Sequence, residues 1–231
     1  PGQAQVKKVV CEMGGKNANI IDADADLDQA VSLVVKGAFG YAGQKCSACS
    51  RVIVLDDVYP AFVERLKKAV DSLILAPADQ TSCRLGPVVD RQAYERLHEI
   101  INKADAEGVI LYKGETPKAD GLFVPPVVAQ VNSPDHPLFQ EELFGPVLTL
   151  FCAKDFEEAL ELALHSRFSL TGSLFSRNND HIALARKKFR VGNLYINRES
   201  TGAIVERQPF GGFAMSGLGN KAGGPNYVRL F

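Results

Sequence analysis

One cysteine stands where a reactive thiol would be expected. Cys46 lies in a short loop, residues 43–49, after a helical pattern and before a β-branched run. Loops that are held by rigid elements are where catalytic groups concentrate. A thiol attacks as its thiolate, which neighbouring cations and backbone dipoles promote, and Lys45 is adjacent. We therefore interpret Cys46 as a candidate nucleophile, although a lone free cysteine is more often a small buried hydrophobic residue.

Cys46 also forms a C-x-x-C pair with Cys49, which raises the possibility of a redox or a metal site. A thioredoxin-type pair would sit between a strand and the start of a helix, whereas this pair follows a helix and precedes a strand. A structural zinc site would need a second Cys or His pair. The other cysteines and the histidines are scattered singly, so we predict neither a redox pair nor a metal site.

Glu12 is the candidate general base. It follows the apolar run Val9-Val10-Cys11 and precedes Gly14 and Gly15, and a pair of glycines lets another segment or a ligand approach the backbone closely. A glutamate at the end of an apolar strand has reason for a raised pKa, which a base working near neutral pH needs. A solvated glutamate at a strand end is nevertheless the commoner case.

A third group of interest is the turn Glu-Glu-Leu-Phe-Gly-Pro at residues 141–146. A carboxylate here could accept both hydroxyl hydrogens of a ribose, and an aromatic face could pack on an adjacent ring. By contrast, the segment 217–222, Gly-Leu-Gly-Asn-Lys-Ala, fits a loose dinucleotide pattern but follows no strand and has no acidic residue about 20 positions later. We do not interpret it as a phosphate loop.

A cysteine hydrolase is the main alternative class, because cysteine nucleophiles in such enzymes work with a histidine base. The chain has four histidines, His98, His136, His165 and His181, and none stands in a Gly-rich or otherwise unusual context. The sequence leaves open whether one of them lies near Cys46 in space.

The elements that must position these residues alternate along the chain. Helical periodicity or capping predicts helices over residues 26–42, 60–73, 91–106, 156–164 and 180–189. Runs of β-branched and other apolar residues predict strands over 52–55, 109–112, 147–151, 170–176 and 194–196. Strands separated by helices of this length imply βαβ crossovers. The predicted fold class is therefore α/β, with a mostly parallel sheet flanked by helices on both faces.

Composition narrows the classes of partner. Hydrophobic residues make up 46% and charged residues 23% of the 231 residues, which is typical of a globular domain. The net charge of -1 gives no electrostatic reason to expect nucleic acid or an anionic membrane. No apolar run approaches the roughly 18 residues of a spanning helix, and the odd number of scattered cysteines does not indicate a disulfide framework.

We expect a cytoplasmic protein, or one of the mitochondrial matrix if eukaryotic. A start at Pro1, without Met, suggests a piece of a longer chain.

Taken together, three motifs resemble the aldehyde dehydrogenase superfamily. They are Glu-x-Gly-Gly-Lys from Glu12, Gly-Gln-x-Cys ending at Cys46, and Glu-x-Phe-Gly-Pro from Glu142, and the separation of 34 (46 − 12) is also the family's usual one. The resemblance implies that Cys46 is the nucleophile and Glu12 the general base. It also implies that Glu142 holds the nicotinamide-side ribose of NAD, with Phe144 packing near it.

A finer resemblance is to the Δ1-pyrroline-5-carboxylate dehydrogenase subgroup, which oxidises glutamate γ-semialdehyde to glutamate. It rests on segments 43–51, 192–198, 200–203, 209–212 and 222–227. It implies that the backbone N–H groups of Gly202 and Ala203 bind the α-carboxylate of the substrate, with help from Ser47. A backbone nest of this kind suits an anion.

The family's dinucleotide-binding half lies upstream of the Glu-x-Gly-Gly motif. We therefore expect residues 1–231 to be the catalytic domain without most of the NAD-binding domain, inactive alone, and part of a homo-oligomer at full length. Two alternatives stay open. One is an aldehyde dehydrogenase of other specificity, and the other is a binding or structural module that merely retains these motifs.

Overall fold

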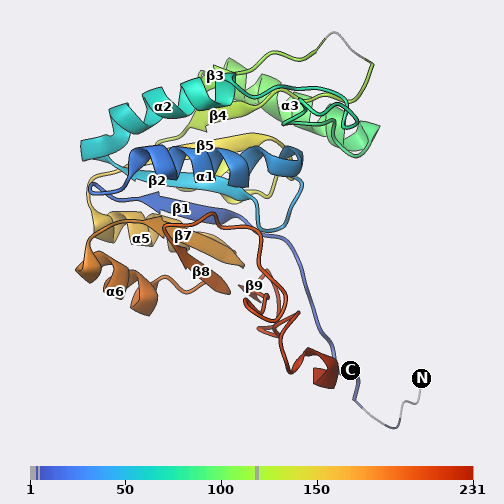
Figure 1. The fold of residues 1–231 in the computed structure, drawn as a ribbon, viewed down its shortest axis with the longest axis vertical. Coiled ribbons are helices and arrows are strands. Elements are labelled where there is room, and N and C mark those ends of the chain that lie inside the picture. The colour runs from blue at the N-terminus through green and yellow to red at the C-terminus, as the bar shows by residue number, and fades with distance from the viewer. Residues whose placement is uncertain (1–3, 5, 118–119, 231) are drawn as a thin grey trace.

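A computed structural model describes residues 4, 6–117 and 120–230 of the chain. Within these residues the central sheet has seven strands in the order β3-β4-β5-β2-β1-β7-β8 (Figure 1). Neighbouring strands run parallel except for the antiparallel pair β3 and β4. The strands are β1 (Asn17–Ile21), β2 (Cys49–Leu55), β3 (Ile110–Lys113), β4 (Val127–Gln130), β5 (Val147–Ala153), β7 (Thr171–Phe175) and β8 (Asn193–Ile196). The predicted α/β class with a mostly parallel sheet is confirmed.

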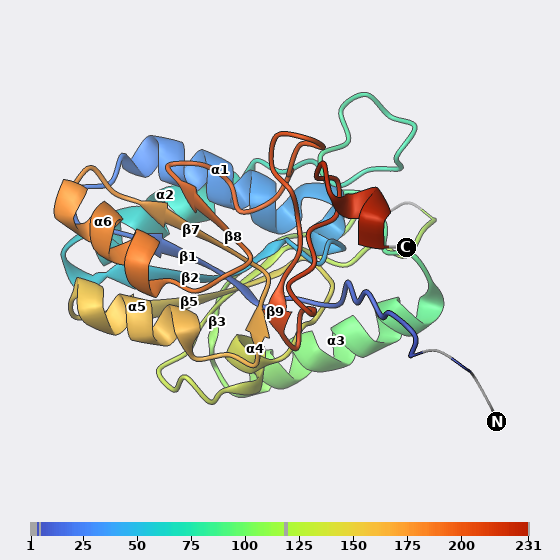
Figure 2. The same ribbon diagram turned by 90° about the horizontal axis from the view of Figure 1, so that it is seen from below.

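Helices cover both faces of this sheet (Figure 2). On one face lie α1 (Leu27–Phe39) and α2 (Tyr59–Asp71), which pack on each other and on β2. On the other face lies α5 (Phe156–Leu164), which contacts β1, β2 and β5 and packs against α6 (Asn179–Lys188). Strand β2 is therefore covered on both sides, and for this reason its residues from Arg51 to Leu55 are all buried.

The smaller elements complete the chain. A long helix, α3 (Arg91–Ala106), precedes β3, and a short one, α4 (Pro137–Gln140), precedes the turn at residues 141–146. A two-stranded antiparallel pair, β6 (Phe168–Ser169) with β9 (Phe213–Ala214), ties the C-terminal segment to the body. Short 3-10 turns occur at η1 (Gly40–Gly43), η2 (Asp56–Val58) and η3 (Tyr227–Leu230).

Capping explains why several helices begin where the sequence predicts. The side chains of Asp26, Asp90, Asp155 and Asn178 each accept a hydrogen bond from the first turn of the following helix. The predictions of helices over 91–106 and 156–164 are confirmed at both ends. Helix α1 ends at Phe39 rather than at residue 42, because Tyr41 and Ala42 take left-handed conformations with φ of 59° and 55°.

Two parts of the predicted pattern need correction. The apolar run before Glu12 is not a strand: Val9 is exposed and Cys11 lies in an irregular segment. The first strand is instead β1, which begins five residues after Glu12 and was not predicted, and β4 was missed as well. Glu12 makes an isolated antiparallel bridge with Gly217, so the C-terminal segment holds it in place of a strand neighbour.

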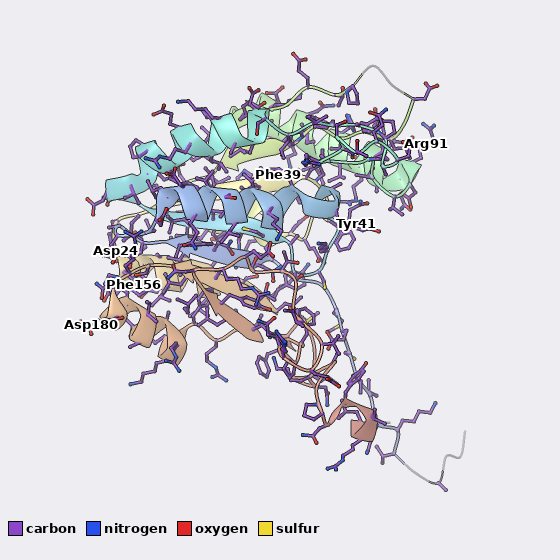
Figure 3. The ribbon with its side chains drawn as sticks, in the orientation of Figure 1. Asp24, Phe39, Tyr41, Arg91, Phe156 and Asp180 are labelled. Carbon is purple, nitrogen blue, oxygen red and sulfur yellow. The ribbon has the colours of Figure 1, made fainter. Side chains whose placement is uncertain are left out.

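The two ends of the molecule differ in what they carry. Figure 3 places Tyr41 and Arg91 at one end and Asp24 and Asp180 at the other. The amino ends of β1, β2 and β5 face the first end, and the described residues near each end of the chain lie on that side (Figures 1 and 2). The candidate residues of the three motifs precede these strands, so they gather at this end.

Candidate active site

The three sequence motifs meet because of the strand order. The Glu12 segment leads into β1, the Cys46 loop into β2 and the 141–146 turn into β5. These strands are parallel neighbours in the order β5-β2-β1, so the segments that precede them lie side by side. Topology thus joins residues that are separated by up to 130 positions, from 12 to 142.

Two glycines allow this close contact. A side chain at position 14 would place its Cβ 1.9 Å from Glu142 Oε2, and one at position 15 would place its Cβ 2.4 Å from the carbonyl oxygen of Cys46. The N–H of Gly15 also donates to Glu142 Oε1 over 2.9 Å. The absence of side chains therefore lets both the carboxylate of Glu142 and the backbone of Cys46 lie against the Gly14-Gly15 segment.

Asn17 is a site residue that the sequence did not reveal. Its Nδ2 donates to the carbonyl oxygens of Cys46 and Ala48, each over 2.8 Å, and its Oδ1 accepts from the N–H of Thr171 over 3.0 Å. The side chain is buried; the two bonds that it donates fix the Cys46 loop to β1, and the bond that it accepts joins β1 to β7. Its partners lie 29 to 154 residues away, so no local spacing could have indicated the role.

The electrostatic setting of Cys46 opposes the expected activation. Partial burial raises the pKa of the Cys46 thiol, and the Glu142 and Glu12 carboxylates raise it further. The backbone N–H groups of Ser47 and Cys46 lower it, as expected for backbone dipoles. Lys45, which is adjacent in the sequence, is exposed and is not among the groups that shift the pKa of the thiol.

Cys49 cannot share the chemistry. It is 1% exposed, and burial raises its pKa to about 12, although Arg51 and Lys16 oppose this. All five cysteines lie in the described ranges and none is in a disulfide. Cys49 thus belongs to the hydrophobic core, and the pair with Cys46 is a coincidence of spacing.

Glu12 lies at the edge of the cluster. Its side chain is exposed, yet neighbouring atoms exclude enough water from the carboxyl to raise its pKa, while the nearby Lys221 ammonium lowers it. The backbone of the next residue, Met13, donates to Ser216 over 3.1 Å. A raised pKa was expected for Glu12, and its cause is partial burial of the carboxyl in an irregular segment rather than a place at the end of an apolar strand.

The 141–146 turn presents a carboxylate and an aromatic ring. Burial raises the pKa of Glu142, and the N–H of Gly15 and the Lys16 ammonium oppose this. Phe144 has a φ of 52° and is 42% exposed, so its ring is available to a ligand. Arg96 of α3 holds the turn by donating to the carbonyl oxygen of Leu143 over 2.7 Å.

An open cavity of about 610 Å³ lies over Cys46. Among the predicted site residues, Cys46, Ser47, Phe144, Gly202 and Ala203 line it, whereas Glu12 and Glu142 do not. The buried hydroxyl of Ser47 donates to Thr201 Oγ1 over 3.0 Å, so the Cys46 loop and the segment 201–203, which both line the cavity, are joined.

These features can be compared with known proteins. The model of the aldehyde dehydrogenase family matches residues 2–231, which is almost the whole chain. The chain belongs to the aldehyde dehydrogenase family. The thiol of Cys46, the carboxylates of Glu12 and Glu142 and the cavity over Cys46 therefore belong to a member of this family.

Relatives of known structure or activity support a finer comparison. The 1-pyrroline-5-carboxylate dehydrogenase of Geobacillus sp. (strain WCH70) is 46% identical over 231 residues, which are 100% of this chain and 45% of that aldehyde dehydrogenase. Proline utilization A from Bdellovibrio bacteriovorus is similar with a TM-score of 0.97 and 49% identity, over 100% of this chain and 24% of that one. A Thermus 1-pyrroline-5-carboxylate dehydrogenase with bound NAD has a TM-score of 0.92 and 43% identity, over 96% and 43% of the two chains. The chain thus spans about half the length of the curated relatives it matches.

The alternatives to an aldehyde dehydrogenase find no support in the geometry. All four histidines lie in the described ranges, and none lines the cavity over Cys46. Each contacts another group: His98 the Tyr94 carbonyl, His136 Glu107, His165 Asp135, and His181 Asp22. Across the described residues, no three His, Cys, Asp or Glu side chains gather as metal ligands would, and no helix combines the length and apolar character that crossing a bilayer requires.

Proposed function

We propose that the natural protein that carries this chain oxidises glutamate γ-semialdehyde, the open form of Δ1-pyrroline-5-carboxylate, to glutamate with NAD through a thioester on Cys46. The observation that carries this proposal is the contact of the three motifs around Cys46, under a cavity that also contains the segment 201–203. We further propose that residues 1–231 form the catalytic domain, and that the adenosine half of the dinucleotide is held by residues outside this chain.

The first step belongs to Cys46. Its thiolate adds to the aldehyde carbon, and the oxyanion that forms is stabilised by the backbone N–H of Cys46 together with a second donor. The raised pKa of the thiol means that little thiolate exists near neutral pH in the absence of ligands. Asn17 holds the loop in place, because its Nδ2 donates a hydrogen bond to the carbonyl oxygen of Cys46 over 2.8 Å.

The residues around Glu142 fit the nicotinamide side of NAD. Its carboxylate is oriented by the Gly15 N–H and retains acceptor capacity for ribose hydroxyls, and the exposed ring of Phe144 can pack beside a flat ring. When bound, NAD supplies the acceptor for the hydride that leaves the substrate carbon. The positive charge of its nicotinamide also favours the thiolate.

Hydrolysis of the thioester belongs to Glu12. Its ionised carboxylate takes a proton from water as the oxygen attacks the thioester carbon, and the Cys46 thiolate leaves. The carboxyl lies close enough to Cys46 to raise the pKa of the thiol, which supports a role on the same reacting group. Its partial exposure gives water access to it.

Substrate choice would be decided at the segment 201–203. In the described part of the chain, the N–H groups of Gly202 and Ala203 donate to no other residue, while the carbonyl of Gly202 accepts from Arg198 over 3.0 Å. Two free N–H groups at the cavity wall suit a carboxylate such as the α-carboxylate of the semialdehyde. Ser47, which also lines the cavity, can complete the set.

The test of substrate class compares two aldehydes in the natural protein with NAD. The kcat/KM for glutamate γ-semialdehyde should exceed that for pentanal at least about tenfold, because pentanal lacks the carboxylate that would accept from the N–H groups of Gly202 and Ala203, and a hydrogen bond to a charged group is worth about 1.5–3 kcal/mol. Cys46→Ala should abolish turnover with both aldehydes, and Cys49→Ala should retain most of it. Equal kcat/KM values for the two aldehydes would favour an aldehyde dehydrogenase of other specificity.

The role of Glu12 is tested by the time course of the Glu12→Gln variant. Reduced cofactor should appear in a burst of about one equivalent and then stall, because the amide cannot take the proton from water. Mass spectrometry should find the acyl group on Cys46 at the stall. A variant that binds aldehyde normally but gives no burst would show that Glu12 acts before hydride transfer.

A further inference from the structure

Lys221 lies in the Gly-x-Gly-x-x-Ala segment that does not form a phosphate loop, and its ammonium points into the protein. It donates to the carbonyl oxygens of Gly192 over 2.5 Å and Gly211 over 2.8 Å, and to Asn193 Oδ1 over 3.3 Å. An ammonium has three N–H donors, so these contacts use all of them. A lysine whose three N–H groups all donate to the protein is held in a fixed position, unlike a lysine side chain that extends into solvent.

The backbone that Lys221 holds is the surface on which Glu12 rests. A side chain at position 211 would place its Cβ 3.1 Å from Glu12 Oε1, so the carboxylate lies against the Cα of Gly211. The flanking residues Phe210 and Ala222 are joined by an antiparallel bridge, and Glu12 itself is bridged to Gly217. Lys221 therefore links β8, the 210–212 segment and the C-terminal segment around the carboxylate.

We propose that Lys221 is a positioning residue for thioester hydrolysis: it fixes the backbone under the Glu12 carboxylate, and its positive charge favours the ionised, proton-accepting form of that carboxylate. This inference rests on the proposed role of Glu12 as the base. It assigns a function to a segment that the proposed reaction otherwise leaves unused.

The charges around Glu12 agree with this role. Exclusion of water raises the pKa of Glu12, and Lys221 is the charged group that lowers it. The effect is mutual, because burial lowers the pKa of Lys221 while Glu12 raises it. Cys46, which also faces Glu12, is uncharged once it is acylated, so Lys221 is the partner that matters during hydrolysis. Without it, the partly desolvated carboxyl would hold its proton to a higher pH.

An activated ester isolates the step in question from the cofactor. The Cys46 thiolate attacks the carbonyl carbon of p-nitrophenyl acetate and expels p-nitrophenolate, which leaves an acetyl thioester. Water then attacks the thioester carbon, Glu12 takes the water proton, and the thiolate departs with release of acetate. In the natural protein, the decay of acetyl-Cys46 is followed by mass spectrometry across pH, so the acid limb of the profile reports the ionisation of Glu12.

The variants separate charge from structure. Lys221→Met should move the midpoint of the acid limb upward by about one pH unit, so that deacylation below the midpoint slows about tenfold while acylation changes little. Lys221→Gln should show the same shift, since its amide keeps two donors without the charge. Lys221→Arg should restore most of the wild-type midpoint. The exposed Lys187 of α6 provides the matched control, and Lys187→Met should leave the profile unchanged.

The outcomes distinguish the two proposals. A wild-type protein that never becomes acetylated on Cys46 would overturn the proposed function, and this inference with it. A wild-type protein that deacylates normally, with folded Met and Gln variants whose midpoints match it, would overturn the role of Lys221 alone. A uniform fall in rate at every pH would show a merely structural contact. If neither neutral variant folds, Lys221 is a structural residue and the proposal is wrong.

Discussion

At the scale of single residues, three ionisable groups of the site, Cys46, Glu12 and Glu142, lie close together and all have raised pKa values. Cys46 needs to lose a proton, yet the carboxylates of Glu142 and Glu12 both raise the pKa of its thiol. The same two carboxyls are themselves desolvated, so each has a raised pKa. A thiol in this setting is mostly protonated near neutral pH and therefore reacts slowly, and under the proposed function we expect its activation to depend on the positive charge of bound NAD.

This conflict predicts the effect of neutralising Glu142. Glu142→Gln removes the largest charge effect on Cys46, so the pKa of the thiol should fall and iodoacetamide should alkylate Cys46 about 3–10 times faster near pH 7.5. Peptide mapping by mass spectrometry measures the rate at each cysteine. Cys49 should stay unmodified in the native protein in both forms. An unchanged or slower rate at Cys46 would contradict the electrostatic account.

Motifs pointed to the candidate reacting residues of the site but not to the residues that support them. Cys46, Glu12 and Glu142 stand in short patterns whose glycines mark close contacts, so they could be selected from the sequence. Asn17 and Lys221 act through backbone carbonyls in distant segments, and a backbone acceptor leaves no trace in residue type. Lys45 is adjacent to Cys46 but is not among the groups that shift the pKa of the thiol, because adjacency along the chain does not fix the direction of a side chain.

At the scale of elements, periodicity found the amphipathic helices and missed the polar strand. Strand β1 reads Asn-Ala-Asn-Ile-Ile and follows two glycines, so it lacks the β-branched run that marks β2. It becomes a strand because β2 and β7 pair with it on both sides. Strand β4 is only four residues long and follows two prolines. Tertiary pairing, which no local pattern encodes, decides both cases.

The side chain of Arg51 joins β2 to the segment before β1 and to the end of α5. Arg51 of β2 is 2% exposed, and its guanidinium donates to the Lys16 carbonyl over 2.8 Å and to the carbonyls of Leu162, Ala163 and His165 at the end of α5. It also stacks over the ring of Phe139 at 4.7 Å. The carbonyls at a helix end lack partners within the helix, so Arg51 satisfies them inside the protein.

Arg51→Met should therefore be strongly destabilising. It leaves several buried carbonyl oxygens without donors, and we expect the free energy of unfolding to fall by about 2–5 kcal/mol. Urea unfolding of residues 1–231, followed by circular dichroism, measures this loss. Arg186→Met, at an exposed position of α6, is the matched control and should stay within about 0.5 kcal/mol. A loss at Arg51 no larger than the control would show that water or backbone movement satisfies these carbonyls.

At the scale of the whole molecule, the site lies at the amino ends of the strands. Open α/β sheets usually bind ligands outside the carboxyl ends. Here the three motifs precede β1, β2 and β5, and the bridge from Glu12 to the C-terminal segment closes the site from outside the sheet. The order of the elements was predictable from periodicity, but this placement follows from the strand order and from the path of residues 197–230, which have little regular structure.

The pH dependence of folding is a further property of the whole molecule, and two buried groups near the site determine its direction. Lys16 is 2% exposed, its Nζ has no hydrogen-bond partner among the described residues, and burial lowers its pKa from 10.5 to about 7. Above pH 7 the unfolded chain thus holds a proton that the folded chain has released, so the stability rises with pH. Burial raises the pKa of Cys49 from 9.0 to about 12, so above pH 9 the folded chain keeps a proton on this thiol that the unfolded chain releases, and this opposes the rise from Lys16.

We therefore predict that the free energy of unfolding of residues 1–231 rises by about 1–2 kcal/mol between pH 7 and 9, and that this rise flattens above pH 9. Lys16→Met should be more stable than wild type at pH 7 and should lose most of this gain, because methionine fills a similar space without a charge to desolvate. The lowered pKa of Lys221 contributes in the same direction as Lys16, so a small rise should persist in the variant. Cys49→Ala should keep the rise below pH 9 and show a more positive slope than wild type above it. Urea unfolding at 25 °C between pH 7 and 10 measures all three proteins. A wild-type profile that is flat or falling from pH 7 to 9 would contradict the buried, partnerless state of Lys16.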